Sequence, residues 1–381
     1  MTTTLLGGMT PRQFLRDYWQ KKPLLVRQAM PGFRGVVTKS ALMGLAGDRD
    51  VESRLVTRQQ GTWQMQRGPF SRPQVKRLPK TNWTVLVQDL NHFVAVGRDL
   101  LKKFSFIPYA RLDDLMVSYA APGGGVGPHF DSYDVFLLQG EGERRWRISA
   151  QRDLTLMPNV ALKILKNFKA EQEWTLAPGD LLYLPPNIAH DGVAESECTT
   201  YSVGFRAPSA QELAFNFLNF LQDELKLEGM YSDPDLCAQG HPAEIGAAMV
   251  RQTARMLKKL AWDNDACARF LGNYLTEPKP HVFFTPPDEP MTLAQFRREL
   301  RARGITLNLK SRMLSHKKWV FINGECIGAP PAAAGLLREL CDRWMIAPNT
   351  TVDQASLRIL HDWHDNGYLA LPRENDNAGN N

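Results

Sequence analysis

The sequence lacks the features that mark exported, membrane-spanning and disulfide-stabilised proteins. Its first residues, MTTTLLGGMTPRQFLRDYW, contain no basic stretch followed by a long apolar run, so we expect no secretory signal. No run of about 18 apolar residues occurs, so we expect no transmembrane helix and no membrane partner. The cysteines are odd in number and have no Cys-x-x-Cys spacing, which favours reduced thiols in a cytoplasm over a disulfide framework or a zinc site. They are Cys198, Cys237, Cys267, Cys326 and Cys341.

A strong excess of one charge is also missing. The chain has 46 Lys and Arg against 40 Asp and Glu, and the net charge of +6 is too small to indicate a nucleic-acid partner. A length of 381 residues predicts two or three domains. A hydrophobic content of 43% with 23% charged residues is ordinary for a globular protein.

What the chain does contain is a glycine-rich stretch, residues 123–127, that leads into His129-Phe130-Asp131. Side chains two apart on a strand point to the same face, so His129 and Asp131 can supply an imidazole and a carboxylate to one point. His190, in LLYLPPNIAHDGV, is the candidate second histidine. Two histidines and one carboxylate form the facial triad that binds Fe(II) and leaves three coordination positions open for a co-substrate and dioxygen.

Between residues 111 and 205 the pattern is one of short strands separated by glycine and proline turns. The expected strands are 116–120, 133–139, 144–149, 173–186 and 199–205. They predict an α+β chain whose catalytic domain is a double-stranded β-helix, a jelly-roll barrel with the metal site at one mouth. The alternative is a jelly roll whose histidines are only packed. Three ligand-type residues facing one interior favour the metal site.

The part before the jelly roll is less regular. Residues 54–68 predict a β-hairpin that turns at Gln60-Gly61, and residues 82–104 have helical periodicity. The segment between them is basic and rich in proline, and is either a solvated loop or a contact surface for a substrate or RNA. Its basic residues are Arg67, Arg72, Lys76, Arg77 and Lys80.

Beyond Pro208 the periodicity becomes helical, over residues 210–229 and 243–275. Four apolar residues make one stripe on the first of these helices: Phe217, Phe220, Leu221 and Leu225. We interpret residues 209–276 as a helical dimerisation segment. Packing within the chain is the alternative.

The C-terminal part follows a proline-rich linker, residues 276–290. A helix (291–304), strands on both sides of an Asn323-Gly324 turn and two further helices predict a winged-helix-like domain over residues 277–372. The acidic last helix suits a DNA groove poorly, so we expect no direct DNA binding. His361 and His364 lie three apart on it, and we interpret them as surface residues rather than ligands. The tail, residues 373–381, should be disordered.

Several stretches resemble the bacterial ribosomal oxygenases of the JmjC (cupin) class. They are LMVSYAAPGGGVGPHFDSYDVFLLQGEGERRWRIS, APGDLLYLPPNIAHDG and YSVGFRAP, and the similarity extends through TNWTVLVQDLNH and YSDPD. The resemblance implies an Fe(II)- and 2-oxoglutarate-dependent protein hydroxylase with O2 as the other co-substrate. It implies a cytoplasmic homodimer that hydroxylates the β-carbon of an arginine in the sixteenth protein of the large ribosomal subunit. The catalytic domain would be residues 1–208.

The same resemblance assigns the distal carboxylate of 2-oxoglutarate to Arg144. Ser118, which shares a strand face with Asp114 and Met116, could equally help to hold 2-oxoglutarate. Strand alternation predicts that Arg144 shares an inward face with Trp146 and Ile148, and a buried cation needs such a partner. The alternative is that Arg145 or Arg147 faces inward. We expect no catalytic residue beyond the metal ligands.

The resemblance also places Asp114, Met116, Tyr133 and Ser202 around the target arginine. A carboxylate and a hydroxyl accept hydrogen bonds from guanidinium, while Met116 and Tyr133 would flank its aliphatic stem. Asp114 could instead be a solvated residue at the start of a strand.

Two other function classes remain open. A histidyl hydroxylase or lysyl demethylase would share the triad but should want a less acidic pocket than Asp114 provides. A non-enzymatic cupin-type metal-binding protein would share the fold but have little use for an inward Arg144.

Overall fold

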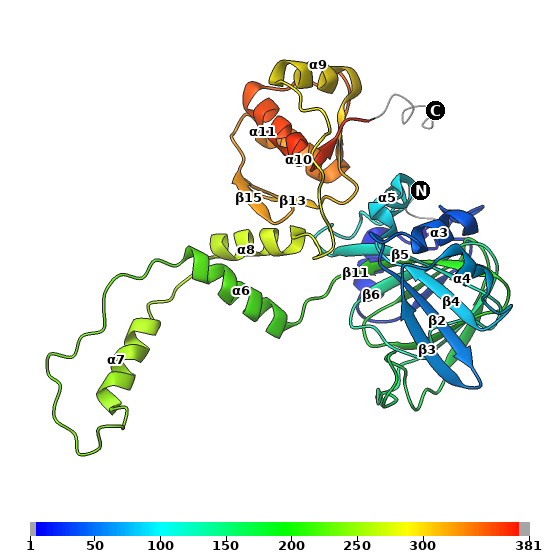
Figure 1. Cartoon of the computed structure of the whole chain (residues 1–381), viewed down its shortest axis with the longest axis horizontal. Helices are drawn as coiled ribbons and strands as arrows, with labels where there is room; N and C mark the ends of the chain where they lie inside the picture. Colours follow the sequence, from blue (N-terminus) through cyan, green and yellow to red (C-terminus); the bar gives the residue numbers. More distant parts are fainter. Residues whose placement is uncertain (1–4, 373–381) are drawn as a thin grey trace. The chain divides into compact units, whose positions relative to one another are not determined.

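The computed structural model describes residues 5–372 and divides into two compact units, Met1–Ala207 and Pro208–Asn381 (Figure 1). The first unit ends at Ala207, and the predicted catalytic domain extends to residue 208. Among the described residues, no helix is long and apolar enough to cross a membrane. The predicted disordered tail lies outside the described residues.

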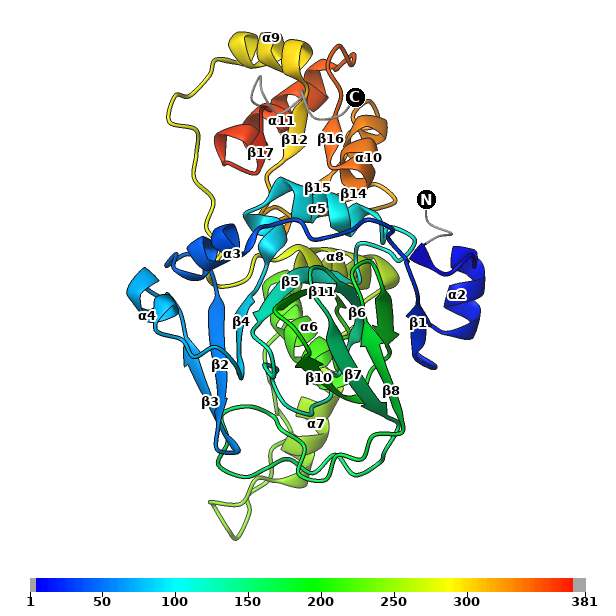
Figure 2. The same ribbon diagram turned by 90° about the vertical axis from the view of Figure 1, so that its right-hand side faces the viewer.

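The first unit contains two antiparallel sheets (Figure 2). The larger has eight strands in the order β1-β9-β6-β11-β5-β4-β2-β3, and the smaller has the order β10-β7-β8. The strands are β1 (Leu24–Val26), β2 (Ser53–Gln59), β3 (Thr62–Arg67), β4 (Trp83–Val87), β5 (Leu112–Ala120), β6 (Asp134–Gln139), β7 (Arg144–Ser149), β8 (Gln172–Leu176), β9 (Leu181–Leu184), β10 (Ala189–Ala194) and β11 (Cys198–Phe205).

The core of this unit lies between the inner faces of the two sheets. Val135 and Leu137 of β6 and Leu182 of β9 pack against Trp146 and Ile148 of β7. On β6 and β9 the alternate residues are buried as well, since Phe136 and Tyr183 pack against Phe14 on the other face of the sheet. The arrangement agrees with the predicted jelly roll, and the expected strand 173–186 is broken at a turn into β8 and β9.

The hairpin prediction is confirmed. β2 and β3 pair antiparallel with Gln59 opposite Thr62, and both turn residues, Gln60 (φ 47°) and Gly61 (φ 81°), have the positive φ that a tight two-residue hairpin turn requires.

The prediction of a helix over residues 82–104 is wrong in its first half. Residues 83–87 form β4, which is buried at every position because it pairs with β2 and β5 in the middle of the sheet. A run of apolar residues fits a central strand as well as a helix, and sheet pairing decides between them. Only Ala95–Lys102 (α5) is an α-helix, after a single 3₁₀ turn, η1 (Leu90–His92).

Three further helices precede the jelly roll: α2 (Pro11–Asp17), α3 (Lys39–Ala46) and α4 (Arg72–Lys76). Thr10 caps α2, with a reciprocal bond from Gln13, and Pro11 occupies its first turn. The short helix α4 lies within the predicted basic loop, and Arg72, Lys76 and the following Arg77 are exposed.

The second unit begins with three helices, α6 (Ala210–Glu224), α7 (Ala247–Leu257) and α8 (Asn264–Thr276). Phe217 and Phe220 of α6 lie 5.1 and 5.9 Å from the ring of Phe270 on α8. Two residues of the predicted stripe therefore pack on α8 within the chain, and both remain partly exposed. The aromatic residue Phe215 and Leu218 are instead exposed.

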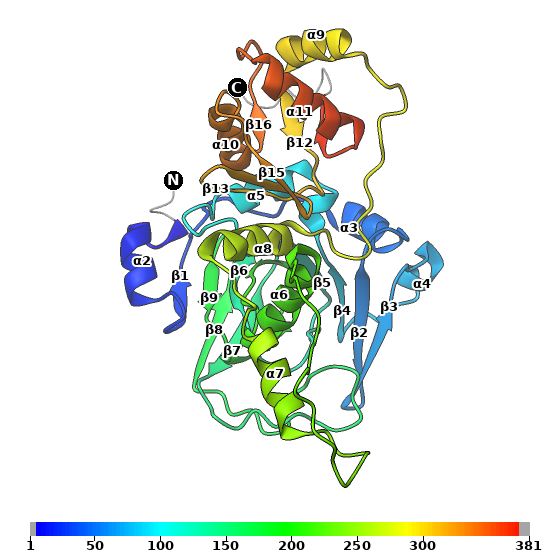
Figure 3. The ribbon, with the colours of Figure 1, turned by 90° about the vertical axis from the view of Figure 1, so that its left-hand side faces the viewer.

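The remainder of the second unit contains α9 (Leu293–Arg303), β12 (Ile305–Leu307), β13 (Met313–His316), β14 (Trp319–Ile322), β15 (Glu325–Gly328), α10 (Ala334–Arg343), β16 (Met345–Ile346), α11 (Gln354–Asp365) and β17 (Leu369–Ala370) (Figure 3). Asn323 (φ 50°) and Gly324 (φ 88°) form the predicted turn between β14 and β15. Helix α8 packs on this hairpin, since a Cβ on Gly272 would lie 2.3 Å from the Phe321 ring.

The interpretation of His361 and His364 as surface residues is wrong. Their rings lie 5.2 and 5.1 Å from the ring of Phe296, and His361 Nε2 lies 2.7 Å from the Met291 carbonyl oxygen. His364 is buried. Both belong to the packing of α11 against α9.

Candidate active site

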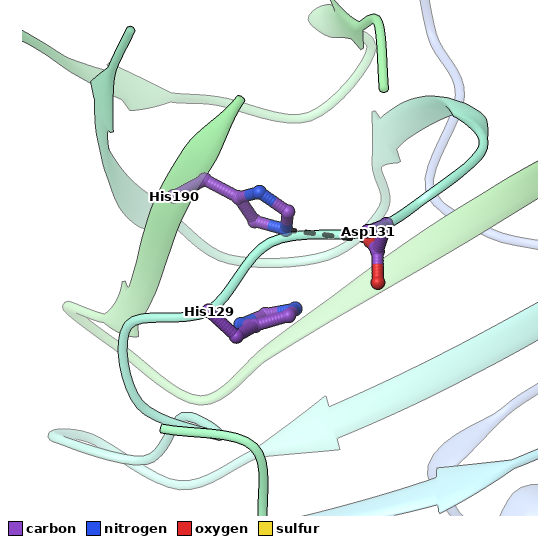
Figure 4. A group of neighbouring side chains, drawn as sticks. All are labelled: His129, Asp131 and His190. Atoms are coloured by element: carbon purple, nitrogen blue, oxygen red, sulfur yellow. Dashed lines mark ion pairs between the residues drawn. The ribbon is translucent and has the colours of Figure 1, made fainter. Parts of the chain in front are cut away.

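His129, Asp131 and His190 converge at one end of the jelly roll (Figure 4). One possible ligand atom from each lies within 4.8 Å of the others, and this is the geometry a single metal ion needs. The prediction that His129 lies on a regular strand is wrong: it forms only an isolated bridge to His190 on β10. The two backbones exchange hydrogen bonds of 2.9 and 2.7 Å.

Backbone carbonyls fix the orientation of both imidazoles. Nδ1 of His129 lies 2.9 Å from the Gly127 oxygen, and Nδ1 of His190 lies 2.9 Å from the Ile188 oxygen. Each Nδ1 therefore carries the proton and donates, so each Nε2 keeps the lone pair that a metal ion requires. Nε2 of His190 is 3.6 Å from a carboxylate oxygen of Asp131.

Burial keeps the buried histidine in the form that binds a metal. Desolvation first, and then the neighbouring His129 ring, lower the pKa of His190, because both disfavour the imidazolium. The neutral ring therefore predominates near pH 7. Asp131 acts in the opposite sense but is the weaker influence.

The three residues open into a cavity of about 460 Å³ within the first unit. Of the other site residues expected from the sequence, five line it: Met116, Ser118, Tyr133, Arg144 and Ser202. Asp114 does not, although it lies on the same face of β5 as Met116 and Ser118. Its side chain is 4% exposed and is bonded to the residues that follow β4.

Arg144 is the inward-facing arginine of β7, as predicted. It is 4% exposed and lines the cavity, while Arg145 and Arg147 pair with Glu195 and Asp191 on the other face. Among the described residues, Nε and Nη2 of Arg144 are buried and have no hydrogen-bond partner. A buried cation without an acceptor is costly, and an anionic ligand in the cavity would relieve that cost.

Several lining residues were not foreseen from the sequence. Glu52, Arg54 and Met65 come from the β2–β3 hairpin or its start, and Lys163 comes from the loop between β7 and β8. Arg67, from the basic segment that the sequence offered as a possible contact surface, lines the cavity as well. The alternation of Arg54 and Val56 on β2 was visible in the sequence. The sequence did not show which face of β2 lies toward the jelly roll, because that depends on the pairing of β2 with β4.

These residues fit an Fe(II) ion and 2-oxoglutarate. Two neutral imidazoles and one carboxylate are the donor set of non-haem Fe(II) oxygenases. Nε and Nη2 of Arg144 are complementary to a carboxylate, which can accept two parallel hydrogen bonds from them. Ser118 of β5 lines the same cavity, with its hydroxyl 3.5 Å from the Thr200 carbonyl oxygen.

Comparison with known proteins gives the same fold and site type. Residues 99–213 match the JmjC domain family, and residues 259–370 match a ROXA-like winged helix. The second match includes α8, which the sequence had placed in the segment before the winged helix.

Relatives and solved structures cover most of the chain. It is 36% identical to the ribosomal protein uL16 3-hydroxylase of Escherichia coli over 320 residues, 83% of this chain and 85% of that protein. It is 40% identical over 232 residues to a probable ribosomal oxygenase of Haemophilus influenzae, covering 60% of this chain and 55% of that one. The ribosomal oxygenase YcfD of Escherichia coli in complex with cobalt and 2-oxoglutarate superposes with a TM-score of 0.82 at 32% identity, covering 95% of this chain and 98% of that one. The chain therefore belongs to the JmjC-domain ribosomal oxygenase family.

Proposed function

We propose that this protein is an Fe(II)- and 2-oxoglutarate-dependent hydroxylase of an arginine β-carbon in uL16, a protein of the large ribosomal subunit. The observation that carries the proposal is one cavity that combines the His129, Asp131 and His190 donors with buried Arg144, whose Nε and Nη2 have no hydrogen-bond partner in the part of the chain that the structure describes. A non-enzymatic metal-binding cupin has no need for that guanidinium. The E. coli relative is named a uL16 3-hydroxylase, and that likeness supports the substrate.

The chain's own residues hold the reactants in place. His129, Asp131 and His190 would bind the iron, and Arg144 with Ser118 would hold the distal carboxylate of 2-oxoglutarate. Iron with 2-oxoglutarate and O2 supplies the oxidising chemistry, which inserts one oxygen atom into a C–H bond and yields succinate and CO2. The protein's contribution is to present one C–H bond to that centre and to limit access of water.

The substrate arginine would enter past Tyr133, which is 39% exposed at the cavity. Met116 and Tyr133 would contact its aliphatic stem, and the Ser202 hydroxyl would accept a hydrogen bond from its guanidinium. Asp114, beside this wall, would supply the compensating charge. A desolvated guanidinium needs such a partner, and lysine cannot make the same forked contact.

We further propose that the protein works in the cytoplasm, where ribosomal proteins are made, and that it forms a homodimer through the helical segment 209–276. The exposed Phe215 and Leu218 of α6 are better placed for such an interface than the stripe that packs on α8. We expect no direct DNA binding by the winged-helix-like domain.

Intact-mass analysis of ribosomal proteins from the host with and without this gene tests the proposed function. We expect uL16 to lose the mass of one oxygen atom when the gene is deleted, and to regain it when wild-type protein is supplied from a plasmid. A plasmid with His129→Ala is the matched control and should not restore the mass. An unchanged uL16 mass on deletion would contradict the proposal.

A further inference from the structure

The turn after β4, residues 88–92, has the sequence QDLNH, and three of its residues bond to the start of β5. The Gln88 side-chain amide donates to Oδ2 of Asp114 in a short hydrogen bond. The backbone N–H of Asp89 lies 3.4 Å from the same oxygen. The Asn91 side-chain oxygen accepts from the backbone N–H of Leu115 at 2.9 Å. The turn therefore fixes both the Asp114 carboxylate and the backbone beside it.

The backbone of this turn is shaped for that contact. Asp89 has a φ of 51°, in the left-handed region that residues other than glycine adopt rarely and at a cost of about 1 kcal/mol or more. The left-handed residue reverses the chain after β4 and allows its own N–H to approach Asp114. Asp89, Asn91 and Asp114 are all buried, so these bonds form away from solvent.

The cavity connects to the turn through Arg54. This residue lines the cavity and donates from Nη2 to Oε1 of Gln88 at 2.8 Å. Guanidinium can only donate and carboxylate can only accept, so Gln88 must turn its oxygen to Arg54 and its nitrogen to Asp114. Hydrogen bonds are therefore donated in one direction, from Arg54 to Gln88 and from Gln88 to Asp114, and Arg54 determines the orientation of the Gln88 amide.

The other carboxylate oxygen of Asp114 lies on the side of Gly204 and Tyr133. A Cβ on Gly204 would lie 3.2 Å from Oδ1 of Asp114 and 3.9 Å from the Tyr133 ring. The glycine leaves space on β11 where these two side chains come together. Oδ1 of Asp114 is therefore the carboxylate oxygen on the side of Gly204 and Tyr133.

We infer that Gln88 is a positioning residue for substrate recognition: it holds the Asp114 carboxylate so that one oxygen serves the substrate guanidinium, and Arg54 fixes its orientation. This inference rests on the proposed arginine substrate. Gln88 does not line the cavity among the described residues, so its effect on the substrate passes through Asp114. It predicts an effect on peptide binding and none on iron or 2-oxoglutarate.

A double-mutant cycle between Gln88→Met and Asp114→Asn tests the inference, with KM for a uL16 arginine peptide and KM for 2-oxoglutarate as readouts. In the wild-type background, Gln88→Met should raise peptide KM roughly 10-fold, the effect expected for losing a hydrogen bond to a charged group. The KM for 2-oxoglutarate should stay unchanged. In the Asp114→Asn background, Gln88→Met should change peptide KM by less than about two-fold, because the interaction is already lost.

Two further variants separate positioning from folding. Gln88→Glu keeps the size and the bond to Arg54 but opposes two carboxylates, so it should raise peptide KM at least as much as Gln88→Met. Gln74→Met changes a glutamine of α4 outside the cavity lining and should leave both KM values as they are.

The inference is overturned if Gln88→Met raises peptide KM equally in both backgrounds, if it raises the KM for 2-oxoglutarate as much as that for peptide, or if it has no effect. If Asp114→Asn alone leaves peptide KM unchanged, the proposed substrate role of Asp114 fails as well. If the wild-type enzyme does not hydroxylate the arginine peptide at all, the proposed function itself is rejected. The three failures are therefore distinguishable.

Discussion

At the metal site, the residue pattern matters less than the hydrogen bonds that orient it. Each histidine gives its Nδ1 proton to a backbone carbonyl two residues earlier, at Gly127 and Ile188. These bonds select the tautomer and aim Nε2 at the common point. The sequence located the three ligands, but only the bridge between His129 and His190 explains why they meet.

Alanine at His129, Asp131 or His190 should each abolish Fe(II) binding while leaving the fold intact. His129 and Asp131 are partly exposed, so their truncation removes ligands but little packing. His190 is buried with its ring 5.9 Å from that of Trp146, so His190→Ala should also lower thermal stability modestly. Anaerobic isothermal titration with Fe(II), paired with thermal unfolding, measures both effects. Unchanged Fe(II) affinity in all three variants would reject the assignment.

Replacing Arg144 by methionine should raise the KM for 2-oxoglutarate by about 30- to 1,000-fold. This corresponds to roughly 2 to 4 kcal/mol for a lost charge-assisted contact. Iron affinity should not change. Arg145→Met is the control, because Arg145 pairs with Glu195 on the outer face. A larger effect from Arg145→Met would mean that the wrong arginine has been assigned. Succinate formation at varied 2-oxoglutarate gives the comparison.

The cysteines should differ in reactivity according to their burial. Burial raises the pKa of Cys341 to about 12, so it stays a thiol up to well above pH 9 and cannot act as a thiolate nucleophile. Cys237 is exposed. Alkylation of the native protein at pH 8, followed by peptide mass analysis, should label Cys237 and leave Cys341 unmodified until the protein is denatured. Early labelling of Cys341 would contradict its buried environment.

At the scale of elements, pairing and burial decide what local pattern leaves open. The apolar residues 83–87 fit a helix or a strand, and their place between β2 and β5 makes them a strand. On α6, the aromatic pair Phe217 and Phe220 covers Phe270, and a second apolar pair faces outward. A helix with apolar residues on both faces has one face for its own chain and one available for a partner.

Charged substitutions on the two faces of α6 should therefore have different effects. Phe215 and Leu218 are 61% and 62% exposed, so Phe215→Glu with Leu218→Glu should give a monomer with little change in thermal stability. Phe217→Glu should instead lower the free energy of unfolding by about 2 kcal/mol, because it places a charge against Phe270.

Light scattering and thermal unfolding of the same samples separate the two outcomes. A wild-type protein that is monomeric at micromolar concentration would remove the dimer proposal. Dissociation by Phe217→Glu without loss of stability would show that the inner face, not the outer one, meets the partner.

For the whole molecule, the sequence was sufficient for the features set by local pattern. The glycine-rich turn with His129 and Asp131, the alternation that buries Arg144, and the Asn323-Gly324 hairpin all depend on residues close in sequence. What it could not show depends on pairing between distant segments. The β2–β3 hairpin joins the larger sheet through β4, and only that pairing brings Arg54 into the cavity.

Asp114 illustrates the same limit. Alternation placed it correctly on the face of β5 that carries Met116 and Ser118. Asp114 does not line the cavity, because its carboxylate is hydrogen-bonded to Gln88 and Asp89. These two residues lie in a turn for which the periodicity predicts a helix. Both the error and its consequence for the site arise from that one stretch of chain.

The measurement that tests the central claim most directly is turnover of matched synthetic uL16 peptides that carry Arg, Lys or His at the target position. The purified protein would be supplied with Fe(II), 2-oxoglutarate and O2, and each peptide's gain of one oxygen atom would be followed by mass spectrometry together with succinate. We predict that only the arginine peptide is hydroxylated, at its β-carbon, and that Asp114→Asn weakens this turnover by one to two orders of magnitude, roughly 1.5 to 3 kcal/mol. Equal or faster hydroxylation of the histidine peptide would contradict the account and assign the protein to histidyl hydroxylation.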